Sequence, residues 1–402
     1  MHDIFSPPVT SRIYAYPNIA AYEAMVPSNP GFVSMAGQLE GLSEVPQPQK
    51  DREYLYELSS MCAFLTVARE LVFSQAEIDA YAKKTYEDLK NKGIPSDIYE
   101  RSMDYGRAVA QHILAWAAKD NYKQTRTFPK YTVLEQDSAW KPTPPSYMEG
   151  IEPHWNKIRP MVIDSSNQFI PKMPTPFDMN KNSDFYKELM EVYEIGKSLN
   201  KDQLEIAKFW DCNPFVSHQT GHVMFATKKI SPGGHWIGIT AIACRQKNLG
   251  FMETLEAYAR VSISLMDAFI SCWDEKWRSI RVRPETLIQE HIDESWAPLL
   301  QTPPFPEYTS GHSVISRAAA VTLTGLLGDS FAFKDTTEVE YGLPAREFKS
   351  FMEASDEAAK SRLYGGIHYR SACENGVAQG EMVGKFIRQN LRTRKEKNQI
   401  QK

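Results

Sequence analysis

The chain of 402 residues has no long hydrophobic run and no large excess of charge of either sign. Its most apolar stretch, residues 318–327, is interrupted by two threonines and a glycine, whereas a membrane-spanning helix needs roughly 18 consecutive apolar residues. The formal net charge is −4 and the isoelectric point about 6.2. These absences exclude an embedded membrane protein and a globally basic surface for nucleic acid, so any site for an anion must be local.

Cysteine is scarce, and no two cysteines have the CxxC spacing of a zinc or redox motif. The five that are present are widely spread and predicted to be buried thiols: Cys62, Cys212, Cys244, Cys272 and Cys373. The alternation of apolar and polar residues that is typical of strands is also almost absent. The first twelve residues contain no apolar signal-peptide segment, so the cellular location cannot be read from them.

Helical patterns dominate the rest of the chain. Helices are predicted over residues 78–89, 96–116 and 185–199 and from residue 255 onward, with a capping box formed by Ser74 and Glu77 before the first. The proline-rich segment 141–177 is predicted to be a long loop that wraps the core, since it carries the large apolar residues Tyr147, Trp155, Ile158, Met161 and Phe169. The basic tail 388–402 is predicted to be solvated and frayed.

The stretch YTSGHS, residues 308–313, stands immediately before an apolar helical run. Ser310 is placed near the N-cap of that helix, with Gly311 and His312 in its first turn. The unpaired N–H groups of a first turn and the positive end of the helix dipole favour an oxyanion, and glycine lets a ligand approach the backbone. His312 can then exchange a proton with the ligand. The alternative is a serine cap followed by a surface histidine.

Two further segments carry cations at suggestive spacings. In KWRSIRVRP, Lys276 and Arg283 are seven residues apart, which places both on one face of a helix, and Pro284 puts Arg283 at a helix end. In SRLYGGIHYR, Arg362 and His368 are separated by two glycines that offer a helix end and a new start, so their side chains can converge from different helices. The alternatives are a solvated basic face and a packed histidine.

Together the three segments resemble the signature shared by vanadium-dependent haloperoxidases and type-2 phosphatidic acid phosphatases. The stretch SRIYAYPNIAAYEAM, residues 11–25, also resembles bacterial haloperoxidases. The resemblance implies an all-α fold of packed four-helix bundles with long wrapping loops. We expect a single domain over residues 1–402, in which 1–182 hold N-terminal helices and the proline-rich loop and 183–392 the catalytic helical core.

The resemblance also implies a role for each residue of the motif. His368 is expected to be the vanadium ligand, or the nucleophile toward phosphorus if the bound species is a phosphate ester. The oxygens of the oxyanion are expected to be neutralised by Lys276, Arg283 and Arg362 and to accept hydrogen bonds from Ser310 and the Gly311 amide. His312 is expected to be the acid–base group, and Lys276 to polarise the oxidant.

Departures from the shared pattern bear on which chemistry applies. Phe305, in FPEYTSGH, and Trp273 match the haloperoxidase form of the motif rather than the phosphatase form. They are expected to form aromatic walls of a substrate pocket that suits a polarisable halide. Thr309 replaces the usual proline before the SGH triplet, a change expected to affect the turn. The aspartate expected four residues after His368 is replaced by Ala372, so another acceptor, such as a backbone carbonyl, is predicted to hold the second ring nitrogen.

We therefore expect a vanadate-dependent haloperoxidase that oxidises iodide, or bromide, with hydrogen peroxide, working on small molecules without nucleic acid. The alternative within the fold is an acid phosphatase for small phosphomonoesters that acts through a phosphohistidine. Two further alternatives are a divalent-metal site at His218 and His222, which are four residues apart, and a non-catalytic phosphate-binding protein. Family habit predicts a periplasmic or secreted enzyme.

Overall fold

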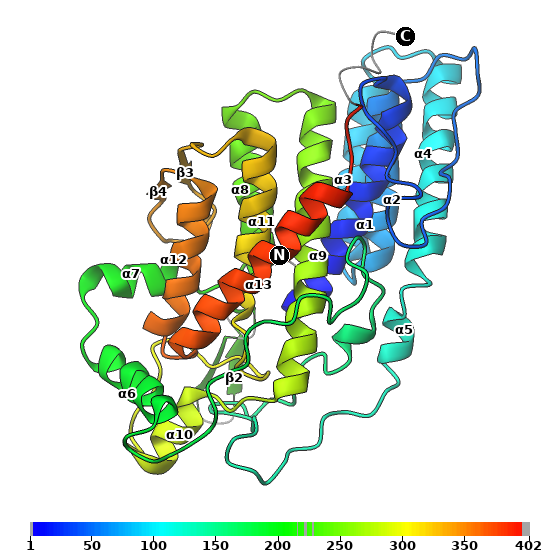
Figure 1. Cartoon of the computed structure of the whole chain (residues 1–402). Helices are drawn as coiled ribbons and strands as arrows, with labels where there is room; N and C mark the ends of the chain where they lie inside the picture. The colour runs from blue at the N-terminus through cyan, green and yellow to red at the C-terminus, as the bar shows by residue number, and fades with distance from the viewer. Residues whose placement is uncertain (1–2, 215, 221–222, 227–228, 396–402) are drawn as a thin grey trace.

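The computed structural model describes residues 3–214, 216–220, 223–226 and 229–395, with the backbone alone described for the two strands between 217 and 226. Helices dominate, and the strands form two short antiparallel hairpins, β1–β2 and β3–β4. The predicted all-α fold is confirmed (Figure 1). No helix in this part of the chain is long and apolar enough to cross a membrane.

The helices and strands follow one another along the chain with these bounds: α1 (Pro7–Met25), η1 (Val26–Ser28), α2 (Tyr56–Leu71), α3 (Gln75–Lys90), α4 (Ser96–Ala117), α5 (Tyr122–Thr125), η2 (Trp155–Lys157), α6 (Asp184–Lys197), α7 (Lys201–Phe209), β1 (Ser217–Thr220), β2 (Val223–Ala226), α8 (Pro232–Gln246), α9 (Phe251–Ser279), α10 (Pro284–His291), α11 (Gly311–Leu327), β3 (Phe333–Asp335), η3 (Val339–Tyr341), β4 (Arg346–Phe348), α12 (Phe351–Tyr364) and α13 (Arg370–Asn390).

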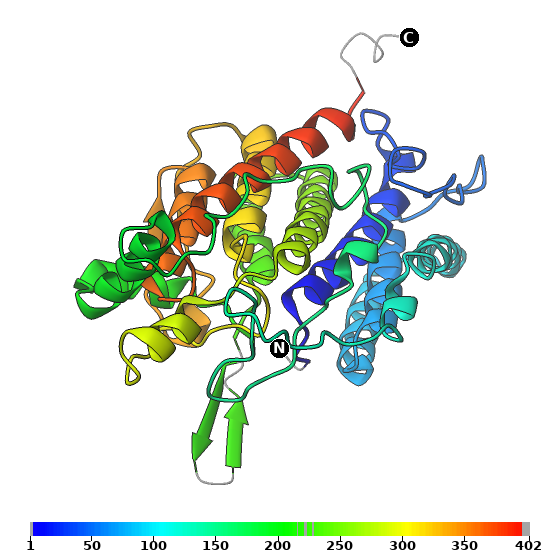
Figure 2. The same ribbon diagram turned by 60° about the horizontal axis from the view of Figure 1, so that its bottom comes forward.

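The long helix α9 forms the centre of the molecule. Helices α1, α2 and α4 pack together on one side of it, and α8, α11 and α13 pack on the other, with α12 against α11 and α13 (Figure 1, Figure 2). The main hydrophobic core runs through both groups, from Val9 to Leu391. The predicted division of the chain at residue 183 stays a prediction.

Helices α11 and α13 lie unusually close together, and glycine makes this possible. A side-chain carbon added at Gly380 would lie 2.1 Å from the Val314 carbonyl oxygen, and one at Gly376 would lie 2.9 Å from the Ser313 side chain. Real side chains cannot be that close, so both positions must lack one. The close approach brings the start of α11 beside the start of α13, where two of the predicted site segments are found.

The proline-rich loop wraps the core as predicted. Trp155, Ile158 and Met161 are buried and Phe169 packs against the core, but Tyr147 is exposed. The loop is anchored on α9 by Asp267, whose fully buried carboxylate accepts hydrogen bonds from the N–H groups of residues 161, 162 and 163 at 2.7, 2.8 and 3.1 Å. Burial raises the pKa of Asp267 to about 6, and the three N–H donors act against that rise.

Replacing Asp267 by alanine is expected to destabilise the protein strongly, because three backbone donors would lose their acceptor in a dry interior. Each unsatisfied buried donor costs roughly 1–3 kcal/mol, and partial hydration leaves a net loss on the order of 3 kcal/mol. Thermal and urea unfolding measure the change, with the exposed Asp104→Ala as the matched control. An unchanged melting temperature would show that other contacts hold the loop.

Two local predictions are wrong. Ser74 does precede α3, but its hydroxyl donates to the Asp3 carboxylate and makes no cap hydrogen bond, so the capping box is absent. The basic tail is not frayed as far as residue 395, because Thr393 is buried and both Thr393 and Arg394 bind the buried Glu256 carboxylate. An internal acid thus holds a segment whose composition indicates solvent exposure. All five cysteines are buried and unpaired, as predicted.

Candidate active site

The site is built around the first turn of α11. Ser310 is its N-cap, and the Ser310 hydroxyl accepts from the Ser313 N–H, as predicted. Gly311 lies against the walls made by α9, since a side-chain carbon there would be 3.6 Å from the Trp273 ring and 4.0 Å from Cε of Lys276. Gly311 also lines the cavity described below, so the first turn of α11 borders it.

Lys276 and Arg283 reach the site from two helices, and not from one continuous helix as predicted. Helix α9 ends at Ser279, Ile280 adopts a left-handed conformation, and Arg283 is the N-cap of α10. Both cations nevertheless lie over the Phe305 ring, each 5.1 Å from its centre, and both are fully buried. The Lys276 ammonium donates to the carbonyls of residues 306, 307 and 309.

His368 lies between α12 and α13, after the glycine pair that ends α12, as the sequence predicts. Its Nδ1 is 2.9 Å from Oε1 of Glu307, and its Nε2 is 3.1 Å from Nη1 of Arg283. Glu307 is fully buried and also accepts from the Tyr369 N–H. The acceptor that replaces the missing aspartate is therefore the side-chain carboxylate of Glu307. The expectation that a backbone carbonyl holds this ring nitrogen is wrong.

This pairing sets the tautomer of His368. With the proton on Nδ1 and shared with Glu307, the lone pair of Nε2 faces Arg283 and is available to a metal. Burial and the neighbouring Arg283, Lys276 and Arg362 lower the pKa of His368 well below its ordinary value. The imidazole is thus neutral at neutral pH, the form that a metal ligand requires.

Arg362 and His312 complete the constellation. Arg362 is buried and donates to the Trp210 carbonyl and the Ser361 hydroxyl. Burial, reinforced by Arg362, lowers the pKa of His312 well below its ordinary value, and its Nε2 is buried without a partner. His312 is therefore a neutral imidazole with a free nitrogen that can accept a proton.

Six predicted residues line one small cavity of about 30 Å³: Trp273, Phe305, Gly311, His312, Arg362 and His368. Lys276, Arg283 and Ser310 do not line this cavity, but each is fully buried and adjoins a residue that does: Phe305, His368 and Gly311, respectively. The Trp273 and Phe305 rings are in contact, with their centres 4.9 Å apart, and form the predicted aromatic wall. The structure thus brings together every residue that the motif singled out.

The electrostatics of the cavity call for an anion. Burial lowers the pKa of Lys276 to about 7 and that of Arg283 to about 10, and it also lowers the pKa of Arg362. Burial raises the pKa of Glu307, the carboxyl that pairs with His368, to about 7, although Arg283 and Lys276 act against that rise. Asp211 also lines the cavity, where its carboxylate is paired with Lys229. An oxyanion would stabilise all three cations in their charged forms.

Among the buried atoms that lack a hydrogen-bond partner in the described chain, two nitrogen atoms at the cavity indicate where such an anion would be held. Nη2 of Arg283 and Nε2 of His312 have no hydrogen-bond partner. Buried polar groups are nearly always paired, so unpaired ones beside a cavity mark the place of a ligand. The donor set, a guanidinium, an ammonium and a helix N-terminus beside a neutral imidazole, fits a tetrahedral oxyanion whose central atom is bound by His368.

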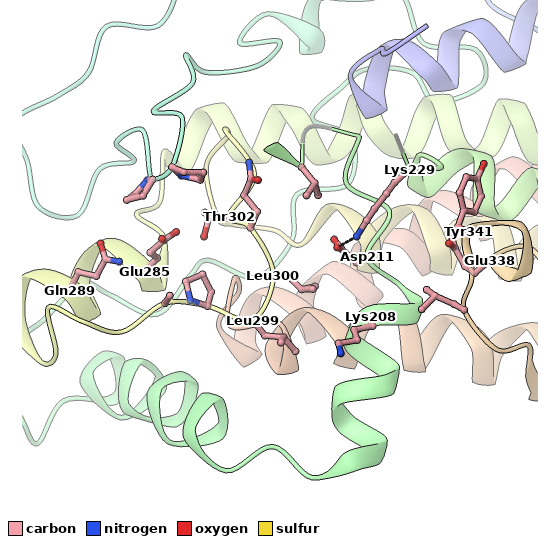
Figure 3. Close-up of a pocket in the computed structure, with 17 residues that line it drawn as sticks. Lys208, Asp211, Lys229, Glu285, Gln289, Leu299, Leu300, Thr302, Glu338 and Tyr341 are labelled. Carbon is pink, nitrogen blue, oxygen red and sulfur yellow. Dashed lines mark hydrogen bonds and ion pairs between the residues drawn. The ribbon is translucent and has the colours of Figure 1, made fainter. Parts of the chain in front are cut away.

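A larger pocket of about 680 Å³, here called the vestibule, lies next to the cavity and shares Asp211 and Gln301 with it. Figure 3 shows Glu285 and Thr302 on one part of its wall, Leu299 and Leu300 at its base, and the ion pair of Lys229 with Asp211 facing Glu338.

The alternative metal site at His218 and His222 is not described by the structure. His218 belongs to strand β1, for which the backbone alone is described, so the helical spacing assumed for the pair does not apply there. His222 lies outside the described residues.

Comparisons with known proteins agree with this geometry. The family model described as the VCPO second helical-bundle domain matches residues 289–396. No protein with a curated description matches the chain. The structure described as that of the first bacterial vanadium-dependent iodoperoxidase is 51% identical, with a TM-score of 0.93 over 98% of this chain and 94% of that chain.

Two structures of a bacterial vanadium-dependent chloroperoxidase, the holo and apo types, are each 15% identical with a TM-score of 0.73. They cover 96% and 97% of this chain and 93% and 95% of those chains, and they show the shared fold. The relative with 51% identity over nearly the full length decides the family. The chain belongs to the vanadium-dependent haloperoxidases.

Proposed function

We propose that this protein binds vanadate in the cavity at the start of α11 and oxidises iodide with hydrogen peroxide. The observation that carries the proposal is the buried cage of three cations around the neutral His368 imidazole, with unpartnered atoms on Arg283 and His312. The similarity to an iodoperoxidase at 51% identity supports iodide as the preferred halide. Bromide is the next candidate because it is less easily oxidised.

The residues of the cage have distinct roles in this proposal. Nε2 of His368 would hold vanadium, while Arg283, Arg362 and the Gly311 amide would hold its oxygens. Bound vanadate supplies a Lewis acid that activates peroxide for two-electron attack by a halide. The Lys276 ammonium now donates to three carbonyls, so it would exchange one of them for the oxidant in order to polarise it. The free nitrogen of His312 would accept or return a proton.

The cavity favours a peroxidase over the phosphatase alternative. The aromatic wall formed by Trp273 and Phe305 suits a polarisable halide and a small oxidant, whereas a phosphatase must admit the leaving group of its ester. Glu307 could also orient a nucleophilic histidine, so the second ring nitrogen alone does not separate the two chemistries.

The proposal is tested by measuring triiodide formation from iodide and hydrogen peroxide on chelator-treated protein, with and without added orthovanadate. Hydrolysis of p-nitrophenyl phosphate is followed on the same metal-free sample. We expect iodide oxidation that orthovanadate restores. Ester hydrolysis that vanadate inhibits, without halide oxidation, would instead identify a phosphatase.

Replacing Phe305 by histidine is expected to change the ratio of bromide to iodide turnover by roughly ten-fold, because an apolar wall beside Lys276 becomes a hydrogen-bonding one. Affinity for vanadate should stay within about two-fold, since no oxyanion donor is lost. Phe305→Leu, which keeps the wall apolar, is the matched control. A vanadate affinity that falls in parallel with the rate would place Phe305 in the oxyanion cage instead.

We also propose export to the periplasm or beyond the cell, on the habit of the family alone. Fractionation of the native host with an antibody against the protein tests this. Recovery in the cytosolic fraction would overturn it.

A further inference from the structure

A second cluster of potential metal ligands lies beside the vanadate cavity. It consists of Cys212, His235 and Glu338. One potential ligand atom from each of these side chains lies within 4.8 Å of the other two, so the three could bind the same ion. All three are buried. They come from three separate segments: the turn after α7, the first turn of α8 and the connection after β3. We call these three residues the thiol–imidazole cluster.

The separations of the ligand atoms match a tetrahedral zinc site. Sγ of Cys212 is 3.3 Å from Nδ1 of His235, Nδ1 is 3.3 Å from Oε1 of Glu338, and the sulfur is 3.9 Å from that oxygen. With bonds of about 2.3 Å to sulfur and about 2.0 Å to nitrogen and oxygen, tetrahedral ligand atoms lie about 3.3–3.6 Å apart. The ion therefore fits with shifts of a few tenths of an ångström.

The imidazole of His235 is held from behind as a metal-bound histidine usually is. Its Nε2 is 2.8 Å from Oδ2 of the fully buried Asp335. The other oxygen of Asp335 accepts from the N–H and hydroxyl of Thr337, which fixes the carboxylate. With an ion bound, His235 would keep its proton on Nε2 and turn the lone pair of Nδ1 toward the space between Cys212 and Glu338. A carboxylate behind a histidine in this way strengthens the histidine as a ligand.

We propose that the thiol–imidazole cluster binds one zinc ion, with water as the fourth ligand. A thiolate, an imidazole and a carboxylate form a donor set that suits zinc better than magnesium or calcium. The competing description is an imidazolium of His235 held between Glu338 and Asp335 beside a neutral thiol. The side chains of Cys212, His235, Glu338 and Asp335 carry a total formal charge of −1 in both cases, with the zinc ion included in the first. The overall charge therefore does not distinguish the two descriptions. Zinc binding would displace about two protons, one from the thiol and one from the imidazolium.

The position of the cluster gives the zinc a structural role in the active site. Cys212 lines the vanadate cavity, and Glu338 lines the vestibule (Figure 3). An ion here would tie the wall between the two spaces to α8. The same turn of the chain provides the Trp210 carbonyl that accepts from Arg362. The proposal concerns a separate ion and does not depend on the halide chemistry.

Zinc content measured by plasma mass spectrometry, on protein exchanged into metal-free buffer after exposure to zinc, tests the proposal. We expect about one zinc per chain in the unaltered protein and in Cys244→Ser, a buried thiol without ligand partners, and none in Cys212→Ser. Calorimetric titration in buffers of different ionisation enthalpy should show release of about two protons per zinc. The readouts involve neither vanadium nor halide oxidation.

Cobalt substitution provides a second measurement on the unaltered chain, which decides the matter even if Cys212→Ser does not fold. A thiolate bound to cobalt produces a near-ultraviolet charge-transfer band, and tetrahedral coordination strengthens the visible bands. Protein that takes up no stoichiometric zinc and shows no thiolate band with cobalt would overturn the proposal in favour of the imidazolium. Zinc retained in Cys212→Ser and Glu338→Gln alike would place the ion elsewhere.

Discussion

Replacing His368 by alanine is expected to abolish vanadate binding and halide oxidation together. Nε2 of His368 is the neutral nitrogen that faces Arg283, whereas the other neutral imidazole of the cavity, His312, has the acid–base role in this proposal. Loss of a partner that only supports a metal ligand costs 10–100-fold, so loss of the ligand itself should weaken vanadate binding by more than about 100-fold.

Equilibrium dialysis against orthovanadate and triiodide formation measure the two effects on one preparation. His291→Ala, at an exposed position, is the matched control and should leave both unchanged. Circular dichroism establishes that the variant is folded. Iodide oxidation retained by folded His368→Ala would mean that another residue binds vanadium, and vanadate retained without activity would mean that the electrostatic cage alone holds the anion.

The residues of the cage could be predicted from the sequence because each has a local signal. Ser310 before an apolar helical run indicates an N-cap, and the glycine pair before His368 indicates a break between helices. The resemblance to the family motif then indicates that the three segments around Lys276, Ser310 and His368 belong to one site. Phe305 and Trp273 could be placed on one wall because they flank the same cations in the motif.

What could not be predicted depends on contacts between segments far apart in the chain. Glu307 stands next to the motif, but its side chain is recognisable as the partner of His368 only when residues 307 and 368 meet in space. Helix α9 ends before Ile280, which is left-handed although it is not a glycine. Because the sequence has no glycine at this position, it predicts a continuous helix from Lys276 to Arg283. The thiol–imidazole cluster joins residues 212, 235 and 338, with no short spacing that could reveal it.

The second large effect is expected at Glu307, a positioning residue that touches His368 but not the oxyanion. Glu307→Ala removes the acceptor for Nδ1 of His368 and for the Tyr369 N–H, so the ring loses both its tautomer and its orientation. We expect vanadate affinity to fall by about 100-fold, the upper end for a lost partner of a metal ligand. Glu307→Gln keeps an oxygen acceptor and loses the charge, and should fall by about ten-fold.

A graded response would distinguish positioning from simple packing. Both variants remove a buried carboxylate, but only alanine leaves a void and two unpaired donors, so a purely structural role would leave Glu307→Gln close to the unaltered protein in vanadate affinity. Titration with orthovanadate gives the affinity, and turnover at saturating vanadate shows whether the bound site still works. Glu374→Gln, at an exposed position on α13, is the matched control. If vanadate affinity is unchanged in Glu307→Ala, the carboxylate does not replace the missing aspartate, and the lone pair on Nε2 of His368 is fixed by Arg283 instead.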